Sequence, residues 1–220
     1  MATAVLTISS KNYSSWSLRG WLLCKMAGLE FHEEVMSTDD PSTRAELLLM
    51  SPSFLVPCLV HEGIKVWDTL AIAEYLAEIR PEAGLLPKDV AARAHCRAVS
   101  GEMHSGFHNL RSALPMNLKA RFPNFKVWSG AQGDIERVRA IWRECLDTYG
   151  GPYLFGSLTM ADAMYAPVVT RFLTYSILVP PFARQYMSDV LRQEHVAEWI
   201  ESAQDEPWVI EQYEGDKGTA

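Results

Sequence analysis

The chain has 220 residues, 48% of them hydrophobic and 21% charged, and a formal net charge of −7 at neutral pH. This length and apolar content suffice for one compact unit of two parts with a sizeable core. Acidic residues are scattered among basic ones without a block of Lys and Arg, so we expect no nucleic-acid partner. No basic leader is present and no apolar run nears the roughly 18 residues that span a bilayer. We therefore expect a cytoplasmic protein without a membrane partner.

The four cysteines are widely spaced, at positions 24, 58, 96 and 145. They form neither a CxxC pair nor a recognisable zinc-binding pattern. We expect them to be reduced and mostly buried, because an intracellular chain of this size does not need disulfides to hold its core together.

Strand and helix patterns alternate over the first eighty residues. In chain order the predicted elements are a strand over 5–8, a helix from the serines at 14 and 15 to Gly28, a strand over 31–36, a helix over 41–50, a hairpin over 56–60 and 64–67, and a helix over 69–79. The order β-α-β-α-β-β-α predicts a small mixed sheet flanked by helices.

Helical patterns dominate the rest of the chain. Two prolines and a glycine between positions 80 and 89 oppose both helix and strand, so residues 81–89 are predicted to form a linker. The helices predicted beyond it cover 90–114, 134–149, 159–175 and 188–203. The second half is therefore expected to be an all-helical bundle.

Three short motifs stand at the starts of predicted strands or helices. Val56-Pro57 leads into the third predicted strand, Asp68-Thr69 opens the helix after the hairpin, and Thr159-Met160-Ala161-Asp162 begins a long helix of the second half. Pro57 also fits an ordinary strand-entry proline. Thr159 and Asp162 have the spacing of a capping box, with Asp in place of Glu or Gln, and serve structure rather than catalysis.

In this order and spacing, the three motifs resemble the cytosolic glutathione S-transferase superfamily across nearly the whole chain. The resemblance implies an α/β thioredoxin-like glutathione-binding domain over residues 1–80 and an all-α domain over 90–220 that contributes an electrophile site. It also implies glutathione as co-substrate, a homodimer, and a cis Val56–Pro57 bond that lets the backbone of Val56 pair with the cysteinyl part of glutathione. Family members often carry Gly or a polar residue where Phe54 and Leu55 stand.

The γ-glutamyl end of glutathione carries an ammonium and a carboxylate. Such a group needs an acceptor carboxylate beside hydroxyl and N–H donors at a helix N-terminus. Asp68 is therefore expected to take the ammonium, and Thr69 the carboxylate. Either residue could instead simply cap the helix, and the two roles can coexist at one helix start.

The stretch Asn12-Tyr13-Ser14-Ser15-Trp16-Ser17 bears on the chemistry. A hydroxyl that donates to sulfur at a helix N-terminus lowers a thiol pKa from about 8.5 and so favours the thiolate. The stretch resembles the Ser-Ser-Cys-Ser motif of zeta-class and related bacterial members, which aligns Ser14 with the catalytic serine and Trp16 with the cysteine. Ser14 is the predicted donor, and Ser15 and Tyr13 are the alternates. All these serines could also be caps or solvated turn residues.

The electrophile is expected to bind between the two halves. His104, Phe107, His108 and Arg111 share one predicted helix face at spacings of three and four, and a wall of this kind suits a flat or apolar electrophile. The same face could instead be core and domain interface. His104 and His108 have metal-ligand spacing, but no third ligand lies at a telling distance, so we expect no metal.

The predicted function is a glutathione S-transferase that activates the glutathione thiol for attack on a small electrophilic or apolar substrate. A glutathione-dependent peroxidase, reductase or isomerase would use the same site and differ only in the second substrate. A transferase-like binding or scaffold protein without catalysis is the rival from another class. The replacement of the zeta-class cysteine by Trp16 means that maleylacetoacetate isomerase activity does not follow from the resemblance.

Overall fold

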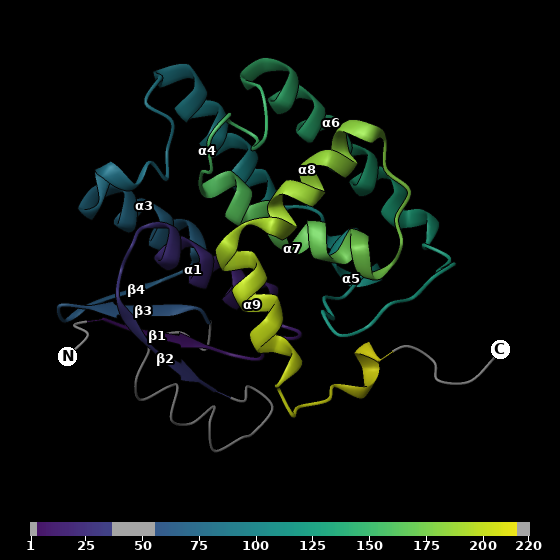
Figure 1. Ribbon diagram of the computed structural model, residues 1–220, viewed down its shortest axis with the longest axis horizontal. Helices are drawn as coiled ribbons and strands as arrows, with labels where there is room; N and C mark the ends of the chain where they lie inside the picture. The colour runs from purple at the N-terminus through teal and green to yellow at the C-terminus, as the bar shows by residue number, and fades with distance from the viewer. Residues whose placement is uncertain (1–3, 37–55, 215–220) are drawn as a thin grey trace.

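A four-stranded mixed sheet forms the core of the N-terminal half in the computed structural model, which describes residues 4–36 and 56–214 (Figure 1). The strands are β1 (Ala4–Ile8), β2 (Phe31–Val35), β3 (Cys58–His61) and β4 (Ile64–Trp67), in the order β2-β1-β3-β4. β1 runs parallel to β2 and antiparallel to β3, and β3 and β4 form the predicted hairpin. The predicted helix over 41–50 lies outside the described residues, as do Phe54 and Leu55.

Two helices cover one side of this sheet. They are α1 (Ser15–Met26) and α3 (Thr69–Ile79), which contact each other above the strands in Figure 1. Central β1 buries Leu6 and Ile8 completely, whereas every residue of the edge strands β2 and β4 is exposed or only partly buried. This burial pattern is expected where two inner strands are covered and two outer ones meet solvent. The mixed sheet flanked by helices is confirmed.

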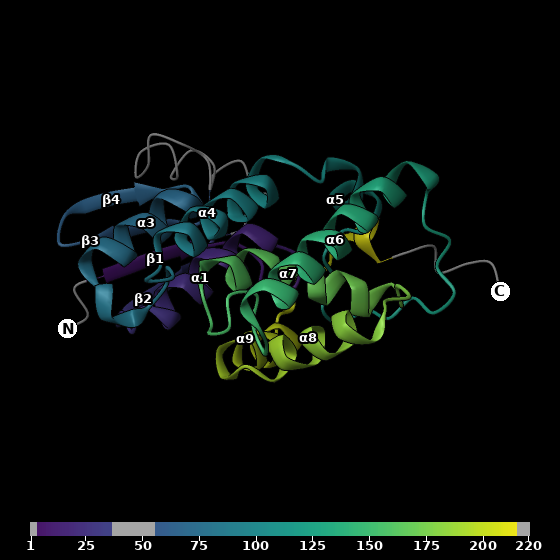
Figure 2. The ribbon, with the colours of Figure 1, turned by 90° about the horizontal axis from the view of Figure 1, so that it is seen from above.

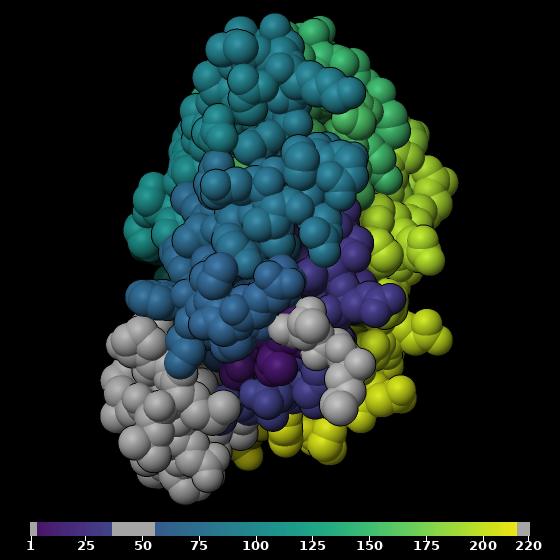
Figure 3. Space-filling model, turned by 90° about the vertical axis from the view of Figure 1, so that its left-hand side faces the viewer, coloured from purple at the N-terminus to yellow at the C-terminus, as the bar shows by residue number. Residues whose placement is uncertain are grey.

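Helices build the rest of the described chain. They are α4 (Val90–Ser105), α5 (His108–Ala113), α6 (Gln132–Tyr149), α7 (Met160–Thr174), α8 (Pro181–Arg192) and α9 (Glu194–Gln204), with short 3-10 helices at Pro81–Ala83, Ser129–Ala131 and Glu211–Tyr213. In the space-filling view, the blue atoms of β4, α3 and α4 cover the middle and upper part of one face, and the yellow C-terminal residues lie along its margin (Figure 3). None of the described helices is both long and apolar enough to cross a membrane.

Helix α7 connects the two halves of the molecule. All but one of its fifteen residues are buried, and it packs against both α1 and α4 (Figure 2). The predicted capping box is present at its start: the Asp162 carboxylate accepts the Thr159 N–H at 2.9 Å and its hydroxyl at 3.2 Å. Asp162 also accepts the Leu154 N–H and the Tyr186 hydroxyl. The cap therefore fixes both the helix and the loop before it.

The prediction of one helix over 90–114 is wrong. Helix α4 ends at Ser105, Gly106 is extended, and Phe107 adopts left-handed backbone angles with φ 58° before α5 begins. A Cβ at position 106 would lie 2.8 Å from the Glu102 carbonyl oxygen, so the chain needs glycine there. The apolar spacing gave no sign of the break, because Met103 and Leu110 on either side of it are both fully buried.

The prediction of one helix over 188–203 is also wrong. α8 ends at Arg192 and α9 begins at Glu194, with the intervening Gln193 in an extended conformation. The Gln193 side chain accepts the Val196 N–H at 2.9 Å and so caps α9. Glutamine is not among the residues that commonly cap helices. The sequence pattern therefore gave no signal for a helix start at this position.

Candidate functional site

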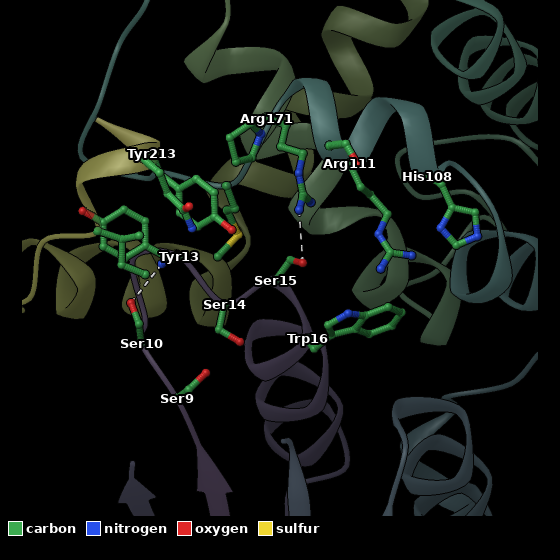
Figure 4. A pocket seen from close by; sticks show the side chains of 15 residues that line it. Ser9, Ser10, Tyr13, Ser14, Ser15, Trp16, His108, Arg111, Arg171 and Tyr213 are labelled. Atoms are coloured by element: carbon green, nitrogen blue, oxygen red, sulfur yellow. Dashed lines mark hydrogen bonds between the residues drawn. The ribbon is translucent and has the colours of Figure 1, made fainter. Parts of the chain in front are cut away.

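Two neighbouring cavities lie at the N-terminal end of α1, and Trp16 lines both of them. The smaller, of about 250 Å³, is lined by Trp16, Val56, Pro57, Asp68, Thr69 and His104. The larger, of about 500 Å³, is lined mainly by residues 9–10 and 13–16, the α5 region and the C-terminal residues around Tyr213 (Figure 4). All four residues predicted to bind glutathione therefore meet in one cavity, next to the serine-rich stretch.

The Val56–Pro57 peptide bond is cis, as the resemblance implied. Helix α1 packs directly against the proline ring: an added Cβ on Gly20 would lie 2.4 Å from Pro57 Cγ. Glycine at position 20 thus allows the start of α1 and the Val56–Pro57 segment to come together. This contact fixes the position of the Val56–Pro57 segment relative to the start of α1, and both line the smaller cavity.

Asp68 and Thr69 sit where β4 passes into α3. Asp68 has φ 77°, in a sparsely populated region, and its carboxylate accepts the Leu70 N–H at 2.8 Å, so the predicted cap is real. The second carboxylate oxygen lies 2.5 Å from Nε2 of His104. Thr69 is 1% exposed, and its hydroxyl has no hydrogen-bond partner among the described residues. A buried, unsatisfied hydroxyl beside a carboxylate suits a ligand with both donor and acceptor groups.

The serines at the start of α1 differ in their contacts. Ser14 is the N-cap, and its hydroxyl accepts the Ser17 N–H at 3.2 Å and donates to Ser17 Oγ at 2.9 Å. Ser15 accepts a hydrogen bond from Arg171 Nη2 at 3.1 Å. The Tyr13 hydroxyl donates to the Glu214 carboxylate at 2.5 Å, and burial, followed by this contact, raises the Tyr13 pKa. The three predicted donor candidates therefore line one cavity in three different hydrogen-bonding states.

Three arginines cluster beside the larger cavity. Arg19 and Arg171 are almost fully buried, Arg111 is partly exposed, and none of the three forms an ion pair with a described carboxylate. Burial, followed by repulsion from the other two guanidinium groups, lowers the Arg19 pKa well below its usual range. Burial and repulsion from Arg111 lower the Arg171 pKa to about 10, so Arg171 still carries its charge at neutral pH.

Trp16 lies within this cationic cluster. The guanidinium carbons of Arg19 and Arg111 lie 4.6 and 4.8 Å from its ring centroid, and the His104 ring packs edge-on at 5.2 Å. A tryptophan face attracts cations through its quadrupole, so the indole ring partly offsets the repulsion between the two guanidinium groups. Trp16 thereby separates the two cavities and holds Arg111 at the wall of the larger one.

The predicted single face of electrophile-binding residues is wrong. His104 belongs to the smaller cavity, His108 and Arg111 line the larger one, and Phe107 is 6% exposed within the hydrophobic core. The break between α4 and α5 is the physical reason, since left-handed backbone at Phe107 rotates the following turn away from the preceding one. The two histidines are therefore not adjacent on one helix.

No sequence motif points to a role for Arg19 or Arg171, and Trp16 stands out in the sequence only as a departure from the Ser-Ser-Cys-Ser motif. One signal was available: Arg171 is a charged residue inside the largely apolar helix pattern of α7, and such a residue needs a special reason to be buried. The contact from Arg171 to Ser15 spans 156 positions, and no local pattern reveals it.

No group of three or more potential metal-ligating side chains occurs among residues 4–36 and 56–214. All four cysteine side chains are buried. Burial raises the pKa of Cys96 to about 11 and that of Cys145 to about 12, and raises that of Cys24 further. These three thiols stay protonated at neutral pH, so they are poor nucleophiles.

Comparisons with known proteins agree with this fold. Residues 13–79 match the family model for the glutathione S-transferase N-terminal domain. The chain is 30% identical over 172 residues to a probable maleylacetoacetate isomerase of Caenorhabditis elegans, covering 76% of this chain and 78% of the relative. It is 27% identical to glutathione S-transferase 1 of Dianthus caryophyllus, covering 78% and 79%. A glutathione transferase homologue from Burkholderia gl BGR1, solved with bound glutathione, superposes with a TM-score of 0.69 at 23% identity, covering 92% of this chain and 98% of that one.

Proposed function

This chain belongs to the glutathione S-transferase superfamily, and we therefore propose that it binds glutathione in the smaller cavity and directs its sulfur at an electrophile in the larger one. The observation that carries the proposal is the unsatisfied Thr69 hydroxyl beside the Asp68 carboxylate, in a cavity that also contains Val56 and Pro57. Asp68 would accept the ammonium of the γ-glutamyl group, and Thr69 would donate to its carboxylate.

The sulfur would lie near Trp16, where the two cavities adjoin and the start of α1 supplies hydroxyl groups. The thiol loses its proton to solvent, and the thiolate is stabilised by a hydroxyl donor and by the N-terminal end of the helix. In conjugation, sulfur forms a bond to an electrophilic carbon, and the leaving group departs with its electron pair. An aryl halide, for example, releases halide ion.

Isomerisation is the second candidate. The larger cavity is lined by Arg111, Arg171 and His108, and no Asp or Glu is found among its described lining residues. This charge favours an electrophile that carries a carboxylate. Thiolate would add to a carbon–carbon double bond, the resulting single bond would rotate, and expulsion of the same thiolate would restore the double bond. Maleylacetoacetate appears in the name of the Caenorhabditis elegans relative, so it is the substrate to test first.

The first test combines calorimetry with glutathione and turnover of a generic aryl halide. We expect a Kd for glutathione in the millimolar range or lower, and a release of halide that depends on glutathione. An assay with maleylacetoacetate then separates the isomerase from the general transferase. Absence of both binding and turnover would overturn the proposal and favour a scaffold protein. The family resemblance further implies a homodimer, which analytical ultracentrifugation tests.

A further inference from the structure

The hydroxyl of Ser14 is occupied within the start of α1. It donates its single hydrogen to Ser17 Oγ at 2.9 Å and accepts the Ser17 N–H at 3.2 Å. Ser17 is fully buried, and its Oγ also accepts the Ser9 N–H at 3.0 Å. To donate to a thiolate, Ser14 would have to withdraw its hydrogen from a buried acceptor, which makes it a poor donor in this arrangement.

The hydroxyl of Ser15 is in the opposite state. It accepts from Arg171 Nη2 at 3.1 Å, and no acceptor among the described residues takes its hydrogen. Ser15 lines the larger cavity, where Figure 4 shows its hydroxyl directed toward the Arg171 guanidinium. A hydroxyl that accepts from a cation becomes a stronger donor, because hydrogen bonds in a chain polarise one another.

Arg171 is firmly placed behind Ser15. Its Nε donates to the Leu114 carbonyl at 2.8 Å and its Nη1 to the Pro167 carbonyl at 3.3 Å, while the residue itself is 4% exposed. Neither carbonyl carries a full charge, so the guanidinium charge is not neutralised by the protein. An unscreened cation one hydroxyl away favours negative charge on a neighbouring sulfur.

We propose that Ser15, rather than Ser14, donates the hydrogen bond that stabilises the glutathione thiolate, and that Arg171 is a positioning residue that acts through Ser15 Oγ. The inference rests on the proposed function. It also gives α7, a helix of the second half, an indirect part, through Ser15, in the chemistry at the start of α1. The other titratable groups around the cavity are Tyr13 with its partner Glu214, His108, Arg111 and Tyr213.

The test measures the thiol pKa of glutathione bound to the protein, from the ultraviolet absorbance of the thiolate as pH is varied. Ser15→Ala should raise this pKa by about one unit, which is a tenfold loss of thiolate at a fixed pH below it. Ser14→Gly, which largely preserves the cap, should shift it less. Ser105→Ala removes an exposed hydroxyl of α4 that lines neither cavity and serves as the control.

Arg171→Met and Arg171→Lys test the positioning role. The methionine variant should raise the bound thiol pKa, and lysine, which keeps the charge, should restore part of the shift. A merely structural role would lower stability in both variants without this difference. If the methionine variant does not fold, the lysine variant and Ser15→Ala decide the question.

The outcomes separate the two proposals. If the wild-type protein does not bind glutathione, both fall. If glutathione binds with normal affinity but Ser14→Gly raises the thiol pKa and Ser15→Ala does not, the role of Ser15 is overturned while the proposed function stands.

Discussion

The carboxylate of Asp68, at the start of α3, lies 2.5 Å from Nε2 of His104 on α4. A side chain of the helical half thus contacts the residue proposed to bind the ammonium of glutathione. The other Asp68 oxygen caps α3 through the Leu70 N–H. Since a carboxylate offers about four lone-pair sites, both oxygens keep acceptor capacity for a ligand. The contact with His104 orients this carboxylate and places α4 in the wall of the smaller cavity.

Replacement of the carboxylate should weaken glutathione binding. Asp68→Asn keeps a side chain that caps helices well but removes the charge. We expect the Kd of glutathione to rise about 10- to 100-fold, because a hydrogen bond to a charged group contributes about 1.5–3 kcal/mol. Calorimetry measures the change. Glu74→Gln, on the exposed part of the same helix, removes a carboxylate that pairs with Arg97 and should leave Kd unchanged. An unchanged Kd in Asp68→Asn would show that the ammonium binds elsewhere.

The charge of the larger cavity should appear in substrate preference. Arg111→Gln should lower kcat/KM for a carboxylate-bearing electrophile about tenfold more than for a neutral one, since a guanidinium binds carboxylates through charge-assisted hydrogen bonds. Loss of the stacking on Trp16 affects both substrates, so the ratio isolates the charge. Arg137→Gln, which breaks an exposed pair with Glu102, is the control. Equal losses for the two substrates would contradict a carboxylate site.

The close contact of α1 with Pro57 predicts an unusual response to alanine. In a helix interior, Gly→Ala normally stabilises by about 0.5–1 kcal/mol. At Gly20 the new Cβ would meet Pro57 at 2.4 Å, so Gly20→Ala should displace the Val56–Pro57 segment and weaken glutathione binding. Gly101→Ala in α4 meets nothing within 4 Å and should show only the stabilisation. Urea unfolding and calorimetry on both variants make the comparison. If Gly20→Ala binds glutathione with wild-type affinity, the contact between α1 and Pro57 can rearrange without affecting the site.

The cap of α7 should be important for stability. Asp162→Ala leaves the buried donors of Leu154, Thr159 and Tyr186 without their acceptor. We expect the free energy of unfolding to fall by at least about 2 kcal/mol, from loss of a cap and of satisfied buried groups. Urea unfolding measures it. Asp147→Ala, an exposed position on α6, is the matched control. A loss no larger than that of the control would refute the role of the network.

Burial raises the pKa of Asp162 to about 6, above its ordinary range near 4. The folded state then holds this proton more tightly than the unfolded state. Protonation of Asp162 therefore adds to the free energy of unfolding. This contribution is fully present below about pH 4 and is lost as pH rises through about 6. It amounts to about 3 kcal/mol, because the pKa differs by roughly two units between the folded and unfolded states. Asp162→Asn does not titrate, so the difference in unfolding free energy between wild type and variant should follow this curve. A difference independent of pH would contradict it.

Much of the fold was predictable because its determinants are local. The order of strands and helices in the first half follows from apolar spacing and turn residues, and α3 was predicted at Thr69–Ile79, the limits that it has. The capping box at Thr159 and Asp162 needs only residues three apart. By contrast, the break at Gly106 and Phe107 was missed, because the helices on both sides bury apolar residues and local spacing continues across it.

The sequence by itself determined the family, the fold class and four residues, Val56, Pro57, Asp68 and Thr69, that meet in the smaller cavity, since the motifs that carry them are short and ordered along the chain. Only the tertiary structure decided the state of each hydroxyl at the start of α1. The partner of Ser15 lies 156 positions away and that of Asp68 lies 36 away. Hydrogen-bond state and local charge depend on such distant neighbours, which packing alone brings together.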